Sequence, residues 1–360
     1  MGAADTVLFL YSIIVYHFPV LKKAFSKHVE IIPGQARVND LQPVSSQSKE
    51  DTEKGTSMLN KLIAGILPHM PKKLVWLFSK EYIAGETLEQ AIVNAKKLNA
   101  EGILTTIDVL GEFISTLGEA EANKKEYLEV IDATEKAGVK GNYSLKPTFF
   151  GLLLDKEVAY HHIREVVAKA ASYNNFVRID MEDSPCTDME IELYRKLKQE
   201  FPGNVGLVVQ AYLKRTRRDI ESFRDMNTPE HPVNLRVCKG IYVEPESIAY
   251  KKYKEINDHF LDDIEYMLQQ NMYPAIATHD APIIEGSYKL IEKYQATPDK
   301  YEFQMLYGVT PALRKSIIDK GHRMRVYVPF GKQWFGYCTR RLKENPEMAG
   351  VIMKALFKKG

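Results

Sequence analysis

The chain has 360 residues, of which 45% are hydrophobic and 27% charged, the composition of an ordinary globular protein. Lys and Arg total 49 against 47 Asp and Glu, so the charge gives no support for a nucleic-acid-binding protein. Cys186, Cys238 and Cys338 have neither metal-ligand nor C-x-x-C spacing, and such thiols suit a reducing cytoplasm better than a disulfide-stabilised secreted protein.

The amino-terminal segment 7–20 is apolar, but it is shorter than the roughly 20 residues of a membrane span. It lacks a charged n-region and a small-residue cleavage site, so we do not expect a signal peptide. The segment is either a helix that caps the domain or an interfacial helix whose following lysines meet anionic lipid. Residues 30–57 are polar and rich in turn formers, so we assign 1–57 as an apolar segment plus flexible linker, and 58–360 as the folded domain.

A regular alternation of strands and helices begins after a predicted helix at 85–102, which has a glycine at each end. Runs rich in Val, Ile and Leu predict strands at 103–110, 143–150, 176–181, 205–212, 234–240, 273–279, 301–306 and 324–330. Helical stretches lie between them, for example at 122–138, 157–174, 188–201, 247–271, 285–295 and 310–321. Eight such units predict an α/β fold, a (β/α)8 TIM barrel with N-terminal helices, one of which would close its bottom.

Polar side chains recur near the carboxyl ends of these predicted strands, where barrel enzymes carry their chemistry. They are Asp108, Glu112, Lys146, Asp180, Glu182, Asp183, Gln210, Tyr212, Arg236, Lys239, Tyr242, Thr278, His279, Asp280, Glu302, Gln304 and Tyr327. Each alone could belong to a structural ion pair. Because unpaired buried charge costs several kcal/mol, their convergence predicts that they meet one another or a polar ligand.

The ligand class stays open at this point. No G-x-G-x-x-G follows a strand and no P-loop is present, which counts against a Rossmann dinucleotide site. The spacing of His279, Asp280 and Glu302 is not a known metal signal, so we expect no metal. Three enzymes fit the remaining groups: an aldolase with a Schiff base on Lys146 or Lys239, a hydrolase using Asp180 or Glu182, and a flavin enzyme.

The carboxyl-terminal stretch 324–345 combines a predicted strand with a helix. Tyr337, Arg340, Arg341 and Glu344 have i, i+3, i+4 and i+7 spacing, so they share one helix face. Two adjacent guanidinium groups beside a phenol and an acid form a surface suited to a carboxylate. The alternative is a solvated basic helix end with ordinary salt bridges, and the stretch by itself does not decide between them.

Seven motifs occur in order, one for nearly every predicted strand. They are IDVLGE (107–112), RIDMED (178–183), VVQAYLKR (208–215), LRVCKGIY (235–242), ATHD (277–280), YEFQMLYG (301–308) and RVYVPFGKQWFGYCTRRLKENP (325–346). From about Pro68 onward the chain resembles the single-function bacterial form of proline dehydrogenase. The resemblance implies a distorted (β/α)8 barrel with non-covalent FAD, oxidation of L-proline to Δ1-pyrroline-5-carboxylate in proline catabolism to glutamate, and reoxidation by a membrane quinone. It also implies a cytoplasmic protein or one peripheral on the inner membrane face.

The resemblance further implies roles for individual residues. Arg236 would bond the flavin near N5 and Asp180 would support Lys146 and the flavin side. The remaining flavin-lining residues would be Met181, Gln210, Lys239, Gly240, Ile241, Thr278 and His279. Arg340 and Arg341 would pair with the proline carboxylate, helped by Lys146, while Leu306, Tyr327 and Tyr337 would shape the pocket around the ring. Glu112 would pair with Arg340 as a gate, and Glu344 would orient the two arginines.

Two positions are informative within this resemblance, one because it departs from the family's usual residue and one because it bears on the substrate. The family usually has a small residue where Ile241 stands, so a larger side chain there would tighten the site or shift the flavin. Relatives that prefer hydroxyproline have a smaller polar residue at the position of Tyr327, which favours proline here. Neither a ribbon-helix-helix start nor an aldehyde dehydrogenase domain is recognisable. The remaining alternatives are oxidation of hydroxyproline or pipecolate, a lysine-dependent barrel aldolase, and a silent flavin-carrying barrel.

Overall fold

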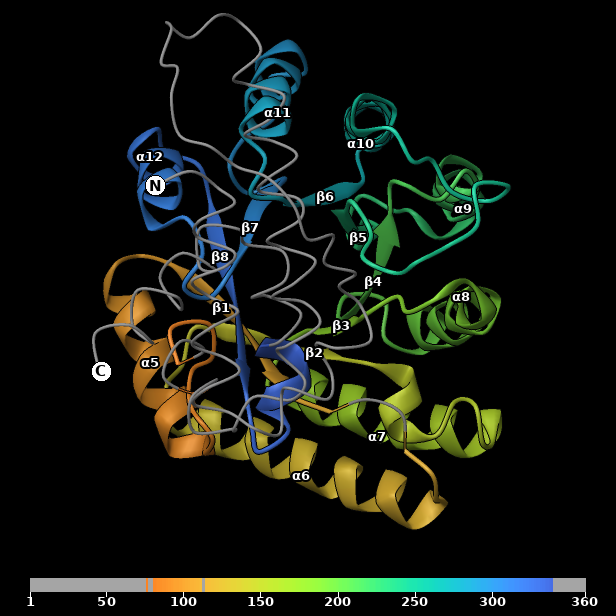
Figure 1. The fold of residues 1–360 in the computed structure, drawn as a ribbon, viewed down its shortest axis with the longest axis vertical. Coiled ribbons are helices and arrows are strands. Elements are labelled where there is room, and N and C mark those ends of the chain that lie inside the picture. The colour runs from red at the N-terminus through yellow and green to blue at the C-terminus, as the bar shows by residue number, and fades with distance from the viewer. Residues whose placement is uncertain (1–75, 77–79, 112–113, 339–360) are drawn as a thin grey trace, which may run out of the picture. The chain divides into compact units, whose positions relative to one another are not determined.

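The computed structural model describes residues 76, 80–111 and 114–338, all within one compact unit, Pro71–Arg341. The strands of this part of the chain are β1 (Leu104–Val109), β2 (Gly141–Leu145), β3 (Val177–Ile179), β4 (Val205–Gln210), β5 (Asn234–Cys238), β6 (Tyr273–Ala277), β7 (Glu302–Leu306) and β8 (Met324–Phe330). They are parallel and close into a barrel in chain order, with β1 paired to β8 (Figure 1). The eight-stranded barrel predicted from the sequence is confirmed.

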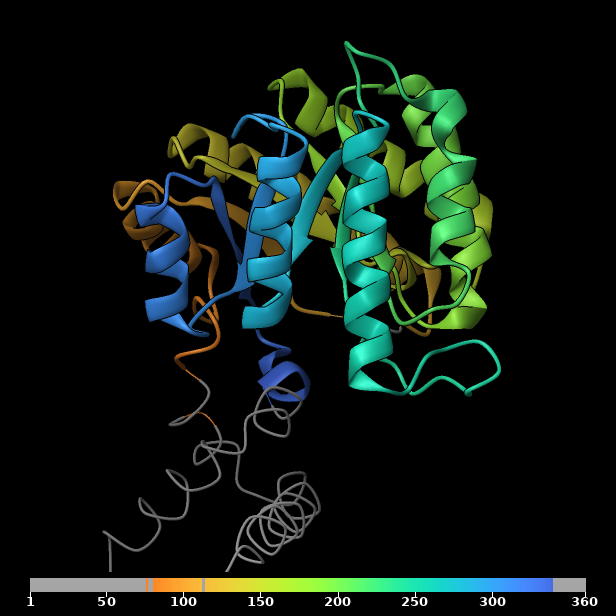
Figure 2. The same ribbon diagram turned by 90° about the horizontal axis from the view of Figure 1, so that it is seen from above.

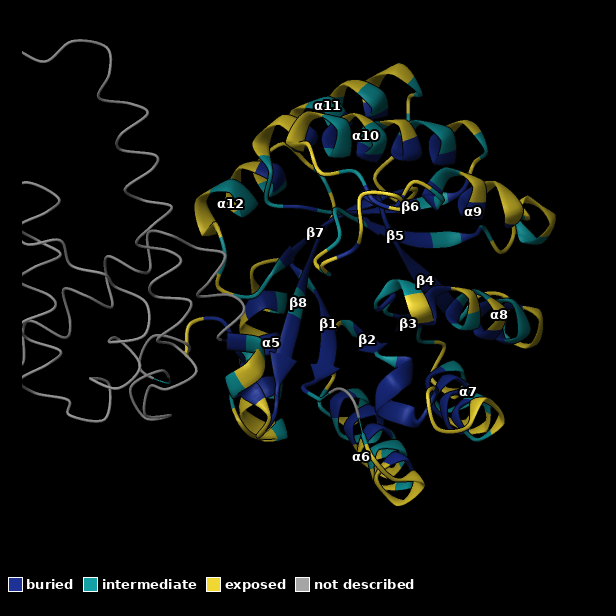
Figure 3. Cartoon of the chain, turned by 45° about the vertical axis from the view of Figure 1, so that its right-hand side comes forward, coloured by how far each residue is buried: buried dark blue, intermediate teal, exposed yellow. Residues whose placement is uncertain are grey.

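Helices lie outside the strands of this barrel. They are α5 (Leu88–Ala100), α6 (Leu117–Lys136), α7 (Lys156–Ser172), α8 (Ser184–Glu200), α9 (Thr216–Ser222), α10 (Tyr253–Gln269), α11 (Ala281–Lys293) and α12 (Pro311–Asp319), with short 3-10 helices η2 (Pro147–Phe150) and η3 (Arg224–Met226). Helices α10 and α11, teal to light blue in Figure 2, pack side by side. Figure 3 shows buried strands in the middle and helices whose exposed residues face outward. The hydrophobic core therefore lies between the strands and this ring of helices.

Several helices begin at side chains that bond the free backbone N–H groups of the first turn. Thr116 and Glu119 form a capping box at α6, in which the Thr116 hydroxyl accepts from Glu119 N and the Glu119 carboxylate accepts from Thr116 N. Asp155 caps α7 by accepting from two backbone N–H groups. Asp280 caps α11, directly after β6. These caps fix where each helix starts, and so fix the loops at the carboxyl ends of the strands.

The structure corrects several predicted boundaries. The strand predicted at 143–150 ends at Leu145, because Pro147 has no N–H to donate and instead starts η2. The helix predicted at 247–271 begins only at Tyr253. Helix α9 was not predicted, since its few residues are mostly polar and give no apolar period. Helix α5, which precedes β1, packs against β1 and β8. The expectation that a helix before the first strand closes the barrel bottom stays a prediction, because before residue 80 the structure describes only residue 76.

Some of the sequence-based assignments concern residues that the structure does not describe. The apolar segment 7–20, the linker and the boundary near Met58 fall on residues that the structure does not describe. Among the helices that it does describe, none is long and apolar enough to cross a membrane.

Candidate active site

Arg236, on β5, is the centre of a buried network at the carboxyl half of the barrel. Its Nε donates to Oε1 of Gln304 on β7 at 2.6 Å. Its Nη1 donates to Oδ1 of Asp180 at 2.7 Å and to the hydroxyl of Ser144 on β2 at 3.2 Å. Only 6% of Arg236 is exposed, so these bonds hold its guanidinium in one orientation.

Asp180 joins this arginine to two further strands. Its Oδ2 accepts from the hydroxyl of Tyr327 on β8 at 2.9 Å, and its Oδ1 also accepts from Ser144 at 2.6 Å. The guanidinium of Arg236 lies 5.2 Å from the centre of the Tyr327 ring. Since Asp180 follows β3 and Gln304 lies on β7, five strands (β2, β3, β5, β7 and β8) contribute to one hydrogen-bonded cluster.

Lys146 and Asp108 form a second ionic pair beside this cluster. The Lys146 Nζ lies 3.5 Å from Oδ1 of Asp108, whose side chain is 1% exposed. Burial raises the pKa of Asp108 to about 6 although the nearby Lys146 opposes the shift. The lysine is therefore paired with a group that titrates just below neutral pH.

The loops after β5 and β6 meet through Lys239 and Asp280. Lys239 Nζ and the hydroxyl of Tyr253 at the start of α10 both donate to Asp280 Oδ2, at 2.5 and 2.6 Å. Gly240 follows with φ +107°, and a Cβ on it would lie 2.1 Å from the Tyr212 ring. Only glycine can take this conformation there without strain. The loop is exposed beyond this point, and Ile241 is 56% accessible.

The other residues of the flavin and substrate sets lie near the same ends of the strands. His279 follows β6, and its Nε2 accepts from the backbone N–H of Leu306 at 2.9 Å. Gln210 ends β4, and its amide donates to the carbonyl of Glu182 at 2.8 Å. The remaining members of the predicted set are Met181 and Thr278, which are buried, and Tyr337, which is partly buried in the helical residues after β8. The structure thus brings the described members of the set to one end of the barrel.

The geometry weighs against one candidate residue in each of two alternative enzymes, Lys239 in the aldolase and Glu182 in the hydrolase. The Lys239 amine is bonded to the Asp280 carboxylate and lies 4.3 Å from the Tyr253 ring centre, so it would have to leave both partners to act as a Schiff-base nucleophile. Glu182 is fully buried, and its two oxygens accept from the backbone N–H and hydroxyl of Thr148 at 2.9 and 2.6 Å. A carboxylate enclosed in this way cannot reach a glycoside.

The buried Glu182 carboxyl also predicts that the stability of the folded protein depends on pH. Burial raises its pKa to about 7, against bonds from Thr148 that oppose the shift. The folded state then binds a proton more tightly than the unfolded chain, so this group's contribution to stability falls as pH rises from about 4.5 to about 7. We expect Glu182→Gln to lessen the loss of stability between pH 5 and pH 8 by about 3 kcal/mol relative to wild type.

The measurement is denaturant unfolding at both pH values, with Glu192→Gln, an exposed glutamate on α8, as the control. If the free energy of unfolding of the Glu182 variant changed with pH as that of wild type does, this carboxyl would not titrate in the folded state. The control variant should match wild type at both pH values.

Some predicted site residues fall elsewhere. Glu112, Arg340, Arg341 and Glu344 lie outside the described residues. Glu302 was placed among the carboxyl-end residues, and that placement is wrong. It is the first residue of β7, and its Oε1 accepts from Arg325 Nε at 2.8 Å at the opposite end of the barrel.

Sequence reasoning missed four partners of the site. Ser144, Thr148 and Tyr253 were not singled out, and Gln304 was noted without a role. Hydroxyl and amide side chains are common in strands and loops, so only their place in the barrel reveals them. For Ser144 the signal that could have found it was a small polar residue inside an otherwise apolar strand.

Comparison with known proteins agrees with this arrangement. A sequence profile of the family described as proline dehydrogenase matches residues 91–354. Proline dehydrogenase 1 of Bacillus subtilis is 38% identical over 283 residues, which cover 79% of this chain and 92% of that protein. Proline dehydrogenase of Deinococcus radiodurans is 32% identical over 293 residues, covering 80% and 93%.

A solved structure gives the same result. Proline utilization A from Bdellovibrio bacteriovorus, inactivated by N-propargylglycine, matches with a TM-score of 0.74 and 25% identity over 83% of this chain. The chain spans only 38% of that longer protein. The family profile and the two relatives, together with the barrel fold, show that the chain belongs to the proline dehydrogenase family.

Proposed function

We propose that the chain uses non-covalently bound FAD to oxidise L-proline to Δ1-pyrroline-5-carboxylate and passes the electrons to a membrane quinone. The observation that carries the proposal is the network of Arg236, Asp180, Tyr327 and Gln304, in a member of the proline dehydrogenase family. A quinone acceptor would bring the protein to the membrane surface, as a peripheral protein.

The donors at the carboxyl end suit an anionic dinucleotide cofactor. Arg236 and Lys239 supply positive charge, and Gln210 and Thr278 supply amide and hydroxyl groups beside them. At Gly240 the backbone lacks a Cβ and has positive φ, which suits close approach to a phosphate. Together with Met181, Ile241 and His279, these residues would hold FAD.

Bound flavin would supply the hydride acceptor for the ring carbon next to nitrogen. Arg236, fixed by three side chains, would offer a rigid donor where negative charge develops. Tyr327, whose hydroxyl is tied to Asp180, would form a wall of the substrate pocket. Leu306 and Tyr337 would form the other walls around the pyrrolidine ring.

The substrate's charged groups would be handled by the basic residues. Arg340 and Arg341 would clamp the carboxylate, with Lys146 helping, while Glu112 would act as a gate and Glu344 would orient the pair. The proline amine must be neutral before its neighbouring carbon can lose hydride. A cationic surround lowers the pKa of that amine, because like charge disfavours the ammonium form.

Product formation tests the proposal directly. The purified chain should bind FAD and, with L-proline and a soluble quinone analogue, form Δ1-pyrroline-5-carboxylate in proportion to the quinone reduced. A protein that cannot be loaded with FAD would refute the flavin assignment. Trapping of substrate on a lysine by borohydride would instead support the aldolase.

The carboxylate clamp has its own prediction. We expect Arg341→Lys to raise the KM for L-proline by about tenfold or more, because a lysine cannot reproduce a bidentate bond to a carboxylate. Steady-state kinetics would measure this change in KM, with Arg218→Lys, at an exposed arginine on α9, as the control. An unchanged KM would remove Arg341 from the substrate site.

A further inference from the structure

A pocket opens at the amino end of the barrel, away from the site described above. Its volume is about 360 Å³, within the range of small-molecule sites. It is lined by Leu104, Lys140, Gly141, Asn142, Asn175, Phe176, Arg178, Asn234, Tyr273, Glu302, Arg323 and Arg325. These residues lie at or just before the first residues of the strands, whereas the proposed proline site lies where the strands end.

The lining of this pocket carries an excess of positive charge. Lys140, Arg178, Arg323 and Arg325 face a single acid, Glu302. Burial opposes ionisation of Glu302, but Arg325 outweighs it and lowers the pKa to about 2, so the acid is charged at neutral pH. Burial and the nearby Arg236 lower the pKa of Arg178 to about 9, which still leaves it mostly protonated. Three positive charges therefore remain uncompensated.

Two of the arginines are held firmly by the barrel. Arg325 donates to Glu302 Oε1 and, through Nη1, to the carbonyl of Thr105, both at 2.8 Å. Arg178 is 1% exposed and its Nη1 donates to the carbonyls of Asn234 and Leu207, at 2.7 and 3.2 Å. Their guanidinium groups are thus preorganised, and little conformational entropy would be lost on binding a ligand.

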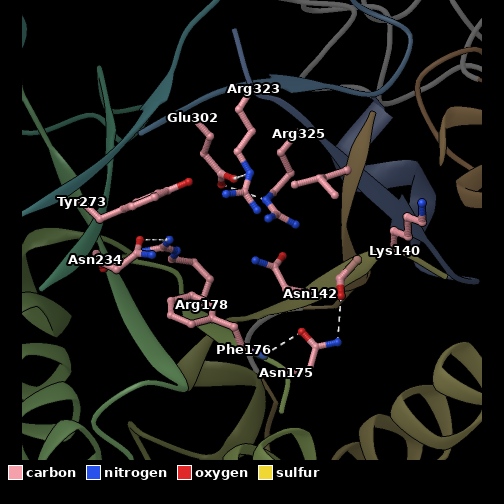
Figure 4. Close-up of a pocket in the computed structure, with 12 residues that line it drawn as sticks. Lys140, Asn142, Asn175, Phe176, Arg178, Asn234, Tyr273, Glu302, Arg323 and Arg325 are labelled. Carbon is pink, nitrogen blue, oxygen red and sulfur yellow. Dashed lines mark hydrogen bonds and ion pairs between the residues drawn. The ribbon is translucent and has the colours of Figure 1, made fainter. Parts of the chain in front are cut away.

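Other donors in the pocket have no acceptor within the described residues. These are both terminal nitrogens of Arg323, Nη2 of Arg325, the side-chain amide nitrogen of Asn142 and the buried Nε of Arg178. Arg323 approaches Glu302 only through Nε, at 3.8 Å. Figure 4 shows the guanidinium groups of Arg323 and Arg325 and the amide of Asn142 pointing toward the same space. Of these donors, the Arg178 Nε is fully buried, and buried donors are normally satisfied. The others remain available to a ligand in the pocket, so this concentration of donors points to an acceptor-rich ligand.

We propose that this pocket binds a small, multiply charged oxyanion, either a di- or tricarboxylate or a phosphate. Guanidinium groups match both carboxylate and phosphate oxygens with paired hydrogen bonds. The uncompensated charge favours a dianion or trianion over a neutral or cationic ligand. The inference does not depend on the proposed proline chemistry, because no residue assigned to flavin or substrate lines the pocket.

Calorimetric titration of the full chain with citrate, and separately with inorganic phosphate, tests the proposal at constant ionic strength in chloride. We expect saturable one-to-one binding of at least one of the two. Binding of citrate alone would identify a carboxylate site, and binding of phosphate alone a phosphoryl site. Arg323→Gln should weaken the binding about tenfold, the loss expected for one charge-assisted contact.

The Arg323 side chain is 41% exposed, so its replacement should not unfold the barrel. The double variant Lys140→Gln/Arg323→Gln should bind more weakly still, and Arg218→Gln, an exposed arginine on α9, should bind as wild type does. Absence of saturable binding by both anions would overturn the proposal. Binding that both pocket variants retain at wild-type affinity would also overturn it, because that site would lie elsewhere.

Discussion

Arg236→Met is expected to lower kcat/KM for L-proline by at least about a hundredfold, the loss typical of removing one preorganised donor from a developing negative charge. The side chain is buried and bonded to Asp180, Ser144 and Gln304. Removing it leaves the Asp180 carboxylate without its cation, so the free energy of unfolding should also fall by about 3 kcal/mol. Steady-state kinetics and denaturant unfolding would measure the two effects.

A double variant separates catalysis from stability. Asp180→Asn in the Arg236→Met background removes the unpaired charge, so stability should largely return while activity stays low. Recovery of both together would show that Arg236 acts only by holding the fold. Arg236→Lys keeps the charge but not the forked geometry, and its activity should lie between those of Arg236→Met and wild type.

Gly240→Ala is expected to have the second large effect, a destabilisation of roughly 3 kcal/mol from backbone strain and overpacking together. The residue has φ +107°, and the added Cβ would lie 2.1 Å from the Tyr212 ring. Because Gly240 separates Lys239 from Ile241 in the proposed flavin site, FAD affinity should fall by about tenfold or more. Thermal unfolding and flavin titration would measure the two losses.

Gly102→Ala is the matched control. Gly102 also has positive φ, at +79°, but an added Cβ would meet no atom within 4 Å. Gly102→Ala should lower the free energy of unfolding only by the strain of the left-handed backbone, about 1 kcal/mol. It should leave FAD affinity unchanged. Equal destabilisation by the two substitutions would mean that the contact with Tyr212 adds nothing.

The barrel could be predicted because its strands are nearly continuous apolar runs separated by helices with clear periodicity. The ends of the strands were harder to predict, because apolar periodicity does not show where backbone pairing stops. The run 143–150 ends in the apolar pair Phe149 and Phe150, yet Pro147 starts a 3-10 helix after Leu145. Helix α9 was missed because its short polar sequence resembles a loop.

The candidate site could be predicted in part. The convergence of Arg236, Asp180 and Tyr327 follows from their places near the carboxyl ends of successive strands, and the structure shows them bonded together. Their connection through Gln304 and Ser144 depends on the side chains that face the barrel interior, which the sequence alone does not show. The assigned flavin and substrate contacts stay predictions.

The amino-end pocket was not predicted, and Glu302 was assigned to the wrong end. The charged residues of this pocket come from strand starts that are far apart in the sequence, with Arg178 on β3, Glu302 on β7 and Arg325 on β8. Closure of the barrel brings these strand starts to one end. In the sequence, Arg178 and Arg325 are isolated charges within apolar strands and show no common site.

Anaerobic mixing of the FAD-loaded protein with L-proline would observe the transfer of electrons from substrate to flavin without any acceptor. We expect rapid bleaching of the flavin absorption by L-proline and much slower bleaching by hydroxyproline or pipecolate. A flavin that stays oxidised with L-proline, or that is bleached only by hydroxyproline, would contradict this expectation.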